Sequence, residues 1–298
     1  MSFSLTAVRR LLLPGVAAAT LAFGPAARAE IHIGVVLSLT GPGASLGIPE
    51  ENALKLWTGD LAGEKVRFTV LNDNTDSTTA AKNTQKLITE EKVDLILGSS
   101  LTPPSLAVVE SAGQAGVPVI SLAGGGAIVL PQDGPRKWAF KLSPTELIST
   151  NMVIDHVLKN KGKTIATIGV ANSYGDGFLK VTEQVAAAKG VKIVASEKYA
   201  PTDQSVTAQV VKILAANPDA VFIHSAGTPG ALPQIELAKR GYKGPVYQTQ
   251  GVANNDFLRV GGKSVEGTFL PAGPVLVVDQ LPASHPLKKS AQAYVAKY

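Results

Sequence analysis

Short apolar segments alternate with amphipathic segments along nearly the whole chain. The apolar segments have the length of β-strands, and the segments between them have helical spacing. This alternation predicts an α/β fold in which parallel sheets carry helices on both faces. The expected strands are Ile31–Leu39, Val66–Asn72, Val93–Gly98 and Val117–Leu122 in the first half, then Thr164–Val170, Val191–Ser196, Ala220–Ser225, Val246–Thr249 and Gly267–Leu270.

Helices are expected between these strands. The first is expected to begin at Pro49, because proline is favoured in a first helical turn, and Glu50 and Glu51 would then lie near the positive end of the helix dipole. The predicted helices are Pro49–Leu61, Ser77–Glu91, Pro103–Ala115, Gly177–Ala188, Ser205–Ala216 and Pro233–Arg240, with a further helix within residues 286–298.

The two halves of the chain begin alike. Lys163–Val170 leads into a Gly-rich loop at Ala171–Gly177, as Ile31–Ser38 leads into LTGPGASLG. We therefore expect two Rossmann-like lobes, joined near residues 141–145 and 271–274, that face one another across a cleft where the strands end. The predicted boundaries are 30–142 for lobe 1, 143–271 for lobe 2, and 272–298 for an incomplete return to lobe 1.

Residues 1–29 have the features of a secretory signal peptide. Arg9 and Arg10 form a basic start, Leu11–Phe23 is a short apolar run, and Ala27 and Ala29 occupy the −3 and −1 positions of a cleavage site. The apolar run has thirteen residues, which is fewer than the roughly 20 that a membrane-spanning helix needs. We expect an exported protein whose mature chain begins at Glu30.

Charge and composition exclude several function classes. Removal of residues 1–29 takes away three Arg and no acid, so 25 Lys and Arg remain against 23 Asp and Glu, without a basic stripe. Nucleic acid is therefore not an expected partner. The chain has no Cys, and segment 73–76 lacks the Gly and Glu of a calcium loop. No metal site is expected, because no pair with ligand spacing occurs among His32, His156, His224 and His285.

The segment LTGPGASLG, residues 39–47, has three interpretations. Gly43–Gly47 matches the G-x-S-x-G elbow of hydrolases with Ser45 as nucleophile, but no earlier strand is present to supply an oxyanion loop. A dinucleotide-binding loop would need a glycine where Leu46 stands. The third interpretation, a loop that cradles a small ligand, is the one we favour, with a purely structural turn as the simpler alternative.

A second loop, Gly98–Ser105, has the same place after a strand. Its hydroxyl residues cluster at the expected start of a helix, with Thr102 as N-cap and Pro103 as the first helical residue. Backbone N–H groups and the Thr102 hydroxyl would form a site for a carboxylate. Alternatively, Thr102 only caps its own helix.

The order of several segments resembles a known family. IGVVLSLTGPGASLG, ILGSSLTPPSLA, VPVISLAGGG, SYGDGF and YQTQGV follow a signal peptide and together resemble the periplasmic solute-binding proteins of branched-chain amino acid type ABC transporters. The resemblance covers the whole mature chain. It implies a type I periplasmic binding fold whose two lobes close on a ligand by hinge motion and deliver it to a membrane permease. It also implies a periplasmic monomer without catalytic residues or a cofactor. Family members are longer, so a C-terminally truncated fold is expected.

The resemblance also implies the ligand contacts. Leu46 stands where amino acid binders often place an aromatic residue, and the carboxylate-binding hydroxyl falls on Thr102. Three positions depart from the family: Gly125 replaces a hydroxyl residue, a small residue near Ala226 replaces a Tyr, and Gln250 replaces an acid that binds ammonium. The implied contacts are Ala44, Ser45, Leu46, Ser100, Leu101, Thr102, Ala123, Gly124, Gly125, Tyr174, Ala226, Gly227, Thr228 and Gln250.

These departures predict the ligand. A buried ammonium group needs a counter-charge, which Gln250 does not supply, although an acid elsewhere in the cleft would. Thr102 still offers a carboxylate site, and Leu46 and Tyr174 favour a flat apolar body. The segments SSLTP, SAGTP and YQT-x-GV are similar to those of binders of aromatic acids such as benzoylformate. An aromatic carboxylate or a 2-keto acid is therefore expected, with a branched-chain or other amino acid as the alternative. A secreted hydrolase using Ser45 and a sensor ectodomain of the same fold are the remaining alternatives.

Overall fold

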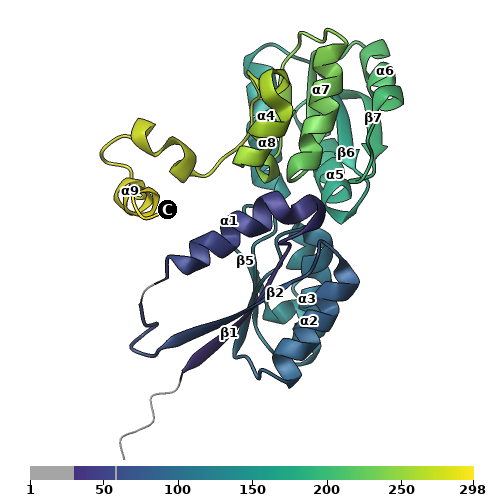
Figure 1. The fold of residues 1–298 in the computed structure, drawn as a ribbon. Helices are drawn as coiled ribbons and strands as arrows, with labels where there is room; N and C mark the ends of the chain where they lie inside the picture. Colours follow the sequence, from purple (N-terminus) through teal and green to yellow (C-terminus); the bar gives the residue numbers. More distant parts are fainter. Residues whose placement is uncertain (1–29, 58) are drawn as a thin grey trace, which may run out of the picture.

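The computed structural model describes residues 30–57 and 59–298 (Figure 1). The predicted signal peptide, residues 1–29, lies outside the described residues. Two parallel sheets form the framework. The first has the order β2-β1-β3-β4-β5 and the second β7-β6-β8-β9. The strands are β1 (Ile31–Leu37), β2 (Val66–Asn72), β3 (Leu95–Gly98), β4 (Val119–Ser121), β5 (Ala139–Lys141), β6 (Thr164–Val170), β7 (Lys192–Tyr199), β8 (Ala220–His224) and β9 (Val246–Gln248).

Helices cover the two sheets and define two lobes. We call the first sheet with α1–α3 the first lobe, and the second sheet with α4–α8 the second lobe. The α-helices are α1 (Ala44–Lys55), α2 (Ser77–Thr89), α3 (Thr102–Gln114), α4 (Glu146–Lys159), α5 (Ser173–Ala188), α6 (Thr207–Ala215), α7 (Ala231–Lys239), α8 (Asn255–Gly261) and α9 (Lys288–Val295). The lobes lie one above the other, with α1 between them (Figure 1).

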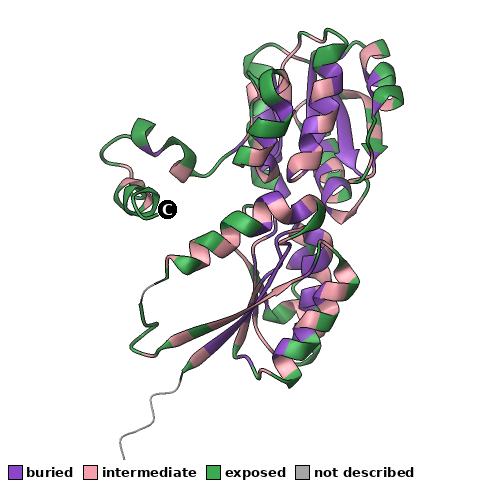
Figure 2. Cartoon of the chain, in the orientation of Figure 1, coloured by how far each residue is buried: buried purple, intermediate pink, exposed green. Residues whose placement is uncertain are grey.

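Each lobe has its own core. In the first lobe, α2 and α3 pack on the face of the sheet that carries Val36 and Ile96, while Leu54 of α1 packs on the face that carries Val35. In the second lobe one continuous cluster is built around the buried rings of Phe178 and Phe222. The buried residues are concentrated in the strands and on the sheet-facing sides of the helices (Figure 2). The predicted two-lobed α/β fold with parallel sheets is confirmed.

The start of α1 was predicted wrongly. The expected helix began at Pro49 and ran to Leu61, but α1 begins at Ala44, directly after a 3₁₀ turn at Gly41–Gly43, and ends at Lys55. Pro49 lies inside the helix, where it costs one backbone hydrogen bond but keeps a helical φ. The LTGPGASLG segment is therefore the first part of a helix, and only its beginning is a loop.

Some elements were missed. Three-residue β5 is too short to show an apolar alternation, and α4 has no narrow apolar stripe because Leu147, Ile148 and Met152 are exposed on it. Helix α8 was also not predicted. Conversely, the expected strand Gly267–Leu270 is reduced to a single bridge between Tyr247 and Phe269.

The end of the chain packs loosely. Within residues 272–298 only Val278 is buried, and α9 packs on the 3₁₀ segment Pro274–Gln280 to one side of the two lobes (Figure 1). Residues of α9 and of this segment line a cavity together with α1 and α8. The chain passes from the first sheet to the second between β5 and α4, but the domain boundaries 30–142, 143–271 and 272–298 remain predictions. Among the described residues, no helix is both long and apolar enough to cross a membrane.

Candidate functional site

The candidate site is a cavity between the lobes, at the carboxyl ends of the strands. This inner cavity has a volume of about 120 Å³. The first lobe supplies α1 and the segments after β3 and β4, and the second lobe supplies the N-terminus of α5 and the segments after β8 and β9. The cavity is lined by Leu46, Glu50, Ser100, Leu101, Thr102, Leu122, Ala123, Gly124, Ser143, Tyr174, Ala226, Gln250 and Gly251.

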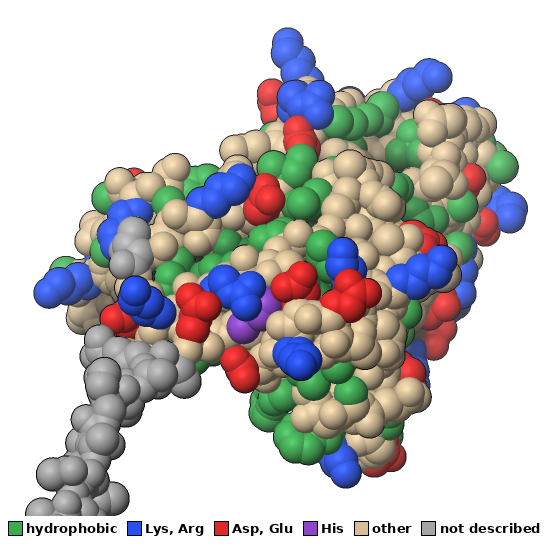
Figure 3. Space-filling view, turned by 60° about the horizontal axis from the view of Figure 1, so that its bottom comes forward, with side chains coloured by type: hydrophobic (Ala, Val, Ile, Leu, Met, Phe, Trp, Pro, Cys, Tyr) green, Lys and Arg blue, Asp and Glu red, His purple; other side chains and the backbone are tan. Residues whose placement is uncertain are grey.

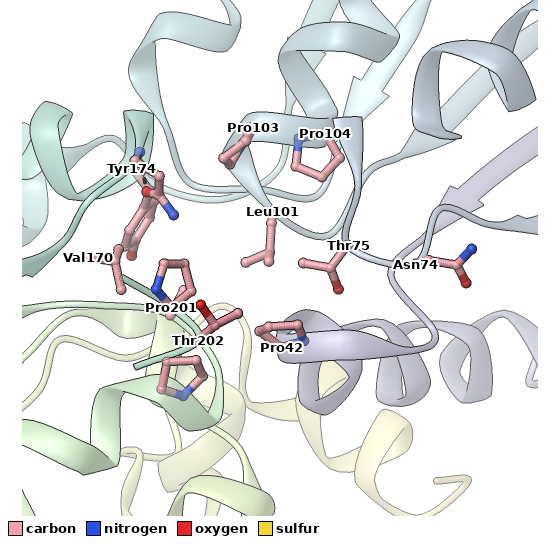
Figure 4. A pocket seen from close by; sticks show the side chains of 13 residues that line it. Pro42, Asn74, Thr75, Leu101, Pro103, Pro104, Val170, Tyr174, Pro201 and Thr202 are labelled. Atoms are coloured by element: carbon pink, nitrogen blue, oxygen red, sulfur yellow. Dashed lines mark hydrogen bonds between the residues drawn. The ribbon is translucent and has the colours of Figure 1, made fainter. Parts of the chain in front are cut away.

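A second, outer cavity of about 280 Å³ adjoins the first. The two share Leu101, Tyr174 and Ala226 as lining residues. Figure 4 shows Leu101 of the first lobe and Pro201 and Thr202 of the second around the same space. Several prolines contribute to its wall, so the outer cavity is mainly apolar.

Most of the predicted contact residues meet at the inner cavity. Nine of the fourteen line it: Leu46, Ser100, Leu101, Thr102, Ala123, Gly124, Tyr174, Ala226 and Gln250. The other five, Ala44, Ser45, Gly125, Gly227 and Thr228, lie outside its lining. A Cβ built on Gly227 would be 3.1 Å from Ser45 Oγ, so these two residues meet where the lobes touch. That any of the fourteen contacts a ligand stays a prediction.

Thr102 was predicted to be the N-cap of its helix, but it is the first residue of α3. Leu101, with extended backbone, is the N-cap, and no side chain caps this helix. The Thr102 hydroxyl instead accepts a hydrogen bond from Gly125 N at 3.2 Å, which leaves its own hydrogen free to donate. A Cβ at position 125 would overlap the Thr102 side chain. A side chain at position 125 would therefore require the Thr102 side chain to shift.

Ser100 is already engaged within the first lobe. Its Oγ donates to Glu50 Oε2 at 2.5 Å and accepts from Ser38 N at 3.1 Å. Behind it, Ser99 Oγ and Ser38 Oγ donate to the buried carboxylate of Asp73 at 2.5 and 2.8 Å. The hydroxyls of Ser38, Ser99 and Ser100 are thus hydrogen-bonded to two acids of the protein, Asp73 and Glu50.

Glu50 is the residue of the inner cavity that the sequence analysis missed. Burial, which is the largest effect, and the charge of Asp73 raise the pKa of Glu50 to about 7, although the Ser100 hydrogen bond acts in the opposite direction. The error came from the predicted start of α1 at Pro49. With the helix beginning at Ala44, Leu46 and Glu50 are four residues apart and share one face, and this spacing was the available signal.

The second lobe contributes Tyr174 and Gln250. Tyr174 Oη donates to Thr249 Oγ1 at 2.9 Å, and burial raises the pKa of Tyr174 well above its usual value, so that the phenol stays neutral. Gln250 Oε1 accepts from Ser149 Oγ at 2.8 Å. Its Nε2 is buried, and no described residue accepts a hydrogen bond from it. Gln250 therefore presents an unused donor at the cavity wall.

The lobes are in contact around this cavity. A Cβ built on Gly124 would lie 3.3 Å from both Tyr174 and Gln250. Next to it, Gly126 N of the first lobe donates to Glu146 Oε1 of the second lobe at 2.7 Å. This is the geometry of a closed cleft, in which a bound molecule would touch both lobes.

The hydrolase alternative places the nucleophile at Ser45. A serine nucleophile needs a base within hydrogen-bonding distance, but no described residue pairs with the buried Ser45 Oγ.

On the molecular face shown in Figure 3, Lys and Arg side chains are interspersed with Asp and Glu side chains. Two lobes around a small cavity that is lined by apolar residues and a few polar groups are the arrangement found in solute-binding proteins.

The chain belongs to a family with this function. The sequence profile of the family described as periplasmic binding protein matches residues 30–298. The predicted membership is confirmed, and the chain is a periplasmic binding protein of the ABC transporter type. Proteins of this family bind small molecules in the periplasm and work with the permeases of ABC transporters.

The names of three similar proteins refer to different ligands or to no particular ligand. The chain is 26% identical over 266 residues to the Leu/Ile/Val-binding protein homolog 3 of Brucella melitensis, covering 87% of this chain and 72% of that protein. A crystal structure of an extracellular ligand-binding receptor from Rhodopseudomonas palustris HaA2 is 42% identical with a TM-score of 0.87, covering 91% of this chain and 75% of that one. An ABC transporter solute-binding protein from Rhodopseudomonas palustris BisB5, in complex with 3,4-dihydroxybenzoic acid, is 26% identical with a TM-score of 0.77, covering 90% and 73%.

Proposed function

We propose that this protein captures a small organic acid in the inner cavity and delivers it to an ABC permease. An aromatic carboxylate or a 2-keto acid is the favoured ligand class. The observation that carries the proposal is the buried amide of Gln250, whose Nε2 has no acceptor among the described residues. A buried donor without a partner costs about 1–3 kcal/mol, and an anionic ligand oxygen would remove that cost.

Backbone groups support the same ligand class. The N–H groups of Leu101 and Thr102, at the start of α3, have no acceptor among the residues that the structure describes. The Thr102 hydroxyl beside them has a hydrogen to donate. Helix N-termini carry a positive partial charge, and α3 and α5 both begin at the inner cavity. A carboxylate between Thr102 and Gln250 would be bound from both lobes.

The apolar part of the lining suits a flat body. Leu46 and Leu122 of the first lobe and Tyr174 and Ala226 of the second surround the remaining space of the inner cavity. Aromatic rings gain stabilisation from such contacts and from stacking or edge contacts with a Tyr ring. One structural relative, the protein from strain BisB5, is in complex with a dihydroxybenzoic acid, which supports the aromatic class.

An amino acid is the second candidate, and one observation favours it. An organic-acid ligand was predicted because the expected cavity residues supplied no counter-charge for an ammonium group. In the structure, however, the carboxyl-bearing residue Glu50 lines this cavity. An ionised Glu50 would neutralise an ammonium group. Several relatives are named as Leu/Ile/Val-binding proteins or their homologues, which is consistent with this candidate.

A calorimetric panel tests the proposal. Benzoate, benzoylformate, 4-hydroxybenzoate and 3,4-dihydroxybenzoate are titrated into the protein beside leucine, valine and glutamate. We expect at least one aromatic acid to bind with micromolar affinity, which corresponds to about −8 kcal/mol, and leucine to bind far more weakly. Tight binding of leucine with no response to any of the acids would overturn the ligand class and leave the transport role intact.

A further inference from the structure

Glu50 presents one anchored oxygen and one free oxygen to the inner cavity. Its Oε2 accepts the Ser100 hydroxyl at 2.5 Å. The only hydrogen bond of the Glu50 side chain with the described residues is this one, so Oε1 has no hydrogen-bond partner among them. Glu50 lines the cavity and is held in place by Ser100, which is in turn held by Ser38. The carboxyl group is therefore fixed in position with one oxygen available to a ligand.

Glu50 has no positively charged neighbour among the described residues that line the inner cavity. The residues that line the inner cavity include no Lys, Arg or His. The nearest acid behind it, Asp73, is fully buried and accepts from Ser38, Ser99 and the backbone N–H of Thr75. Burial and this neighbouring carboxylate raise the pKa of Glu50 to about 7, so about half of the Glu50 carboxyls carry a proton at neutral pH.

We propose that Glu50 determines the specificity of the site by acting as a neutral carboxylic acid that donates a hydrogen bond to the carboxylate of the ligand. Two carboxylates that share one small cavity do not both remain ionised. When the ligand enters as an anion, the ionised fraction of Glu50 takes up a proton from solvent, which forms the O–H bond on Glu50 and breaks none in the ligand. This proposal rests on the organic-acid function above and names the group that selects for it.

The other titratable groups around Glu50 have different partners. Tyr174 faces the cavity from the second lobe and stays neutral. Lys141, at the end of β5, donates to the carbonyls of Gly124 and Pro144, and burial lowers its pKa. The remaining charged groups are Glu146, which accepts from Gly126 N, and the ion pair of Glu51 with Lys55 on the exposed side of α1. None of these groups is hydrogen-bonded to Glu50.

Proton uptake on binding is directly measurable. Each acid of the panel that binds is titrated calorimetrically at pH 7 in phosphate and in Tris, two buffers with different ionisation enthalpies. Since the pKa of free Glu50 is about 7, we expect an uptake of about half a proton per ligand. Above pH 8 the dissociation constant should rise by about tenfold per pH unit, because each unit removes nine-tenths of the protonated form.

Two variants assign the proton to Glu50. Glu50→Gln keeps a neutral donor, so it should bind the acid at pH 6 within a few-fold of the wild type, with no proton exchange and a flat pH profile up to pH 9. Glu51→Gln is the matched control, because Glu51 is the neighbouring carboxyl on α1 and is paired with Lys55 outside the cavity. It should retain the uptake and the pH profile of the wild type.

Failure of this inference can be separated from failure of the organic-acid function. Binding of an aromatic acid without proton uptake by the wild-type protein, or with the same uptake by Glu50→Gln, would overturn the role of Glu50 alone. Binding of leucine but of no acid, with release of a proton, would show that Glu50 is the counter-charge of an ammonium group and would overturn both. The proton count of the wild-type protein does not depend on any variant being folded.

Discussion

Strand β8 of the second lobe is buried along its whole length, whereas β3 of the first lobe alternates between buried and partly exposed residues. Successive side chains of a strand point to opposite faces, so the second sheet is covered on both faces at its centre. In the first sheet, Leu95, Leu97 and Ile120 are only partly buried, on the side where α1 packs. On the α1 side, the first sheet is therefore buried at β1 but less completely covered at β3 and β4.

That helix also serves the binding site. Leu46 and Glu50 of α1 line the inner cavity, and Leu54 packs on the first sheet. A ligand that contacts α1 would thus stabilise the lobe with the thinner core. In the second lobe, Tyr174 and Ala226 of the cavity lining belong to or pack against the large core, and Gln250 and Gly251 stand on a turn that packs in a smaller cluster through Val252. We therefore expect ligand contacts and lobe stability to be coupled more strongly in the first lobe than in the second.

The largest expected effect is a core truncation that compares the lobes. Phe222→Ala removes a fully buried ring of β8 and should reduce the free energy of unfolding by about 3–5 kcal/mol. Phe68→Ala is the matched variant in β2 of the first lobe, where the ring is only partly buried, and should cost about half as much. Urea unfolding measures both. Equal losses would contradict the difference between the two cores.

Acid should weaken the second lobe through His224. Burial lowers the pKa of His224 to about 3, while in the unfolded chain it is about 6.5. Only the unfolded chain binds this proton between these values, so stability is intact above pH 6.5 and falls as the pH drops towards 3. The loss attributable to His224 at pH 5 relative to pH 7 is about 2 kcal/mol.

The measurement is urea unfolding at pH 7 and pH 5, with His224→Gln and, as control, His285→Gln near the chain end. His224→Gln should reduce the loss on acidification by this amount, and His285→Gln should leave it unchanged. An identical pH dependence in His224→Gln and the wild type would show that His224 is not the group responsible.

The contribution of the second lobe to binding is tested by Gln250→Ala. Loss of a hydrogen bond to a charged group costs about 1.5–3 kcal/mol, so the affinity for an aromatic acid should fall by more than about tenfold. Gln85→Ala, on the exposed side of α2, is the matched control and should bind as the wild type does. An unchanged affinity in Gln250→Ala would exclude Gln250 as a ligand donor.

The smallest expected effect concerns the contact between the lobes. Gly124→Ala places a methyl group 3.3 Å from both Tyr174 and Gln250, which is tight enough to hold the lobes slightly apart. We expect a few-fold weaker affinity and little change in stability. Gly273→Ala, where a Cβ meets no atom within 4 Å, is the control. Tighter binding in Gly124→Ala would mean that the lobes are not separated by this methyl group.

The fold could be predicted from sequence because its strands are short segments rich in apolar residues, separated by segments with helical spacing. Strands β2 and β6 begin and end at the predicted residues. Strand β6 is buried along nearly its whole length, as expected for an inner parallel strand, whereas β2 lies at the edge of its sheet and is partly exposed. The start of α1 could not be predicted in this way. Pro49 is a normal signal for the first turn of a helix, but Gly47 already lies within α1. The backbone of Gly47 packs so closely on the Ser38 carbonyl that a Cβ would overlap it. This is a tertiary contact, which a local sequence pattern does not reveal.

The candidate site was predicted better by resemblance than by local pattern. Gln250 was predicted only from the resemblance, whereas Thr102 was predicted both from the local pattern of its loop and from the resemblance, and both line the inner cavity. The expected N-cap role of Thr102 was wrong by one residue, since Leu101 holds that position. Glu50 was missed because it lines the cavity only when α1 begins at Ala44, which places Glu50 on the same helix face as Leu46. The hydrogen bonds of Ser100, which turn it towards Glu50, join residues fifty positions apart and leave no local signal.

The central claim is that an organic acid is bound between the lobes by Gln250 and Thr102, with its carboxylate beside Glu50. A crystal structure of the protein with the tightest-binding aromatic acid tests it most directly. We predict ligand carboxylate oxygens at hydrogen-bonding distance, about 3 Å, from Gln250 Nε2 and from the Glu50 carboxyl group. A ligand bound only in the outer cavity, or an amino acid in the inner cavity with its ammonium group on Glu50, would contradict the claim.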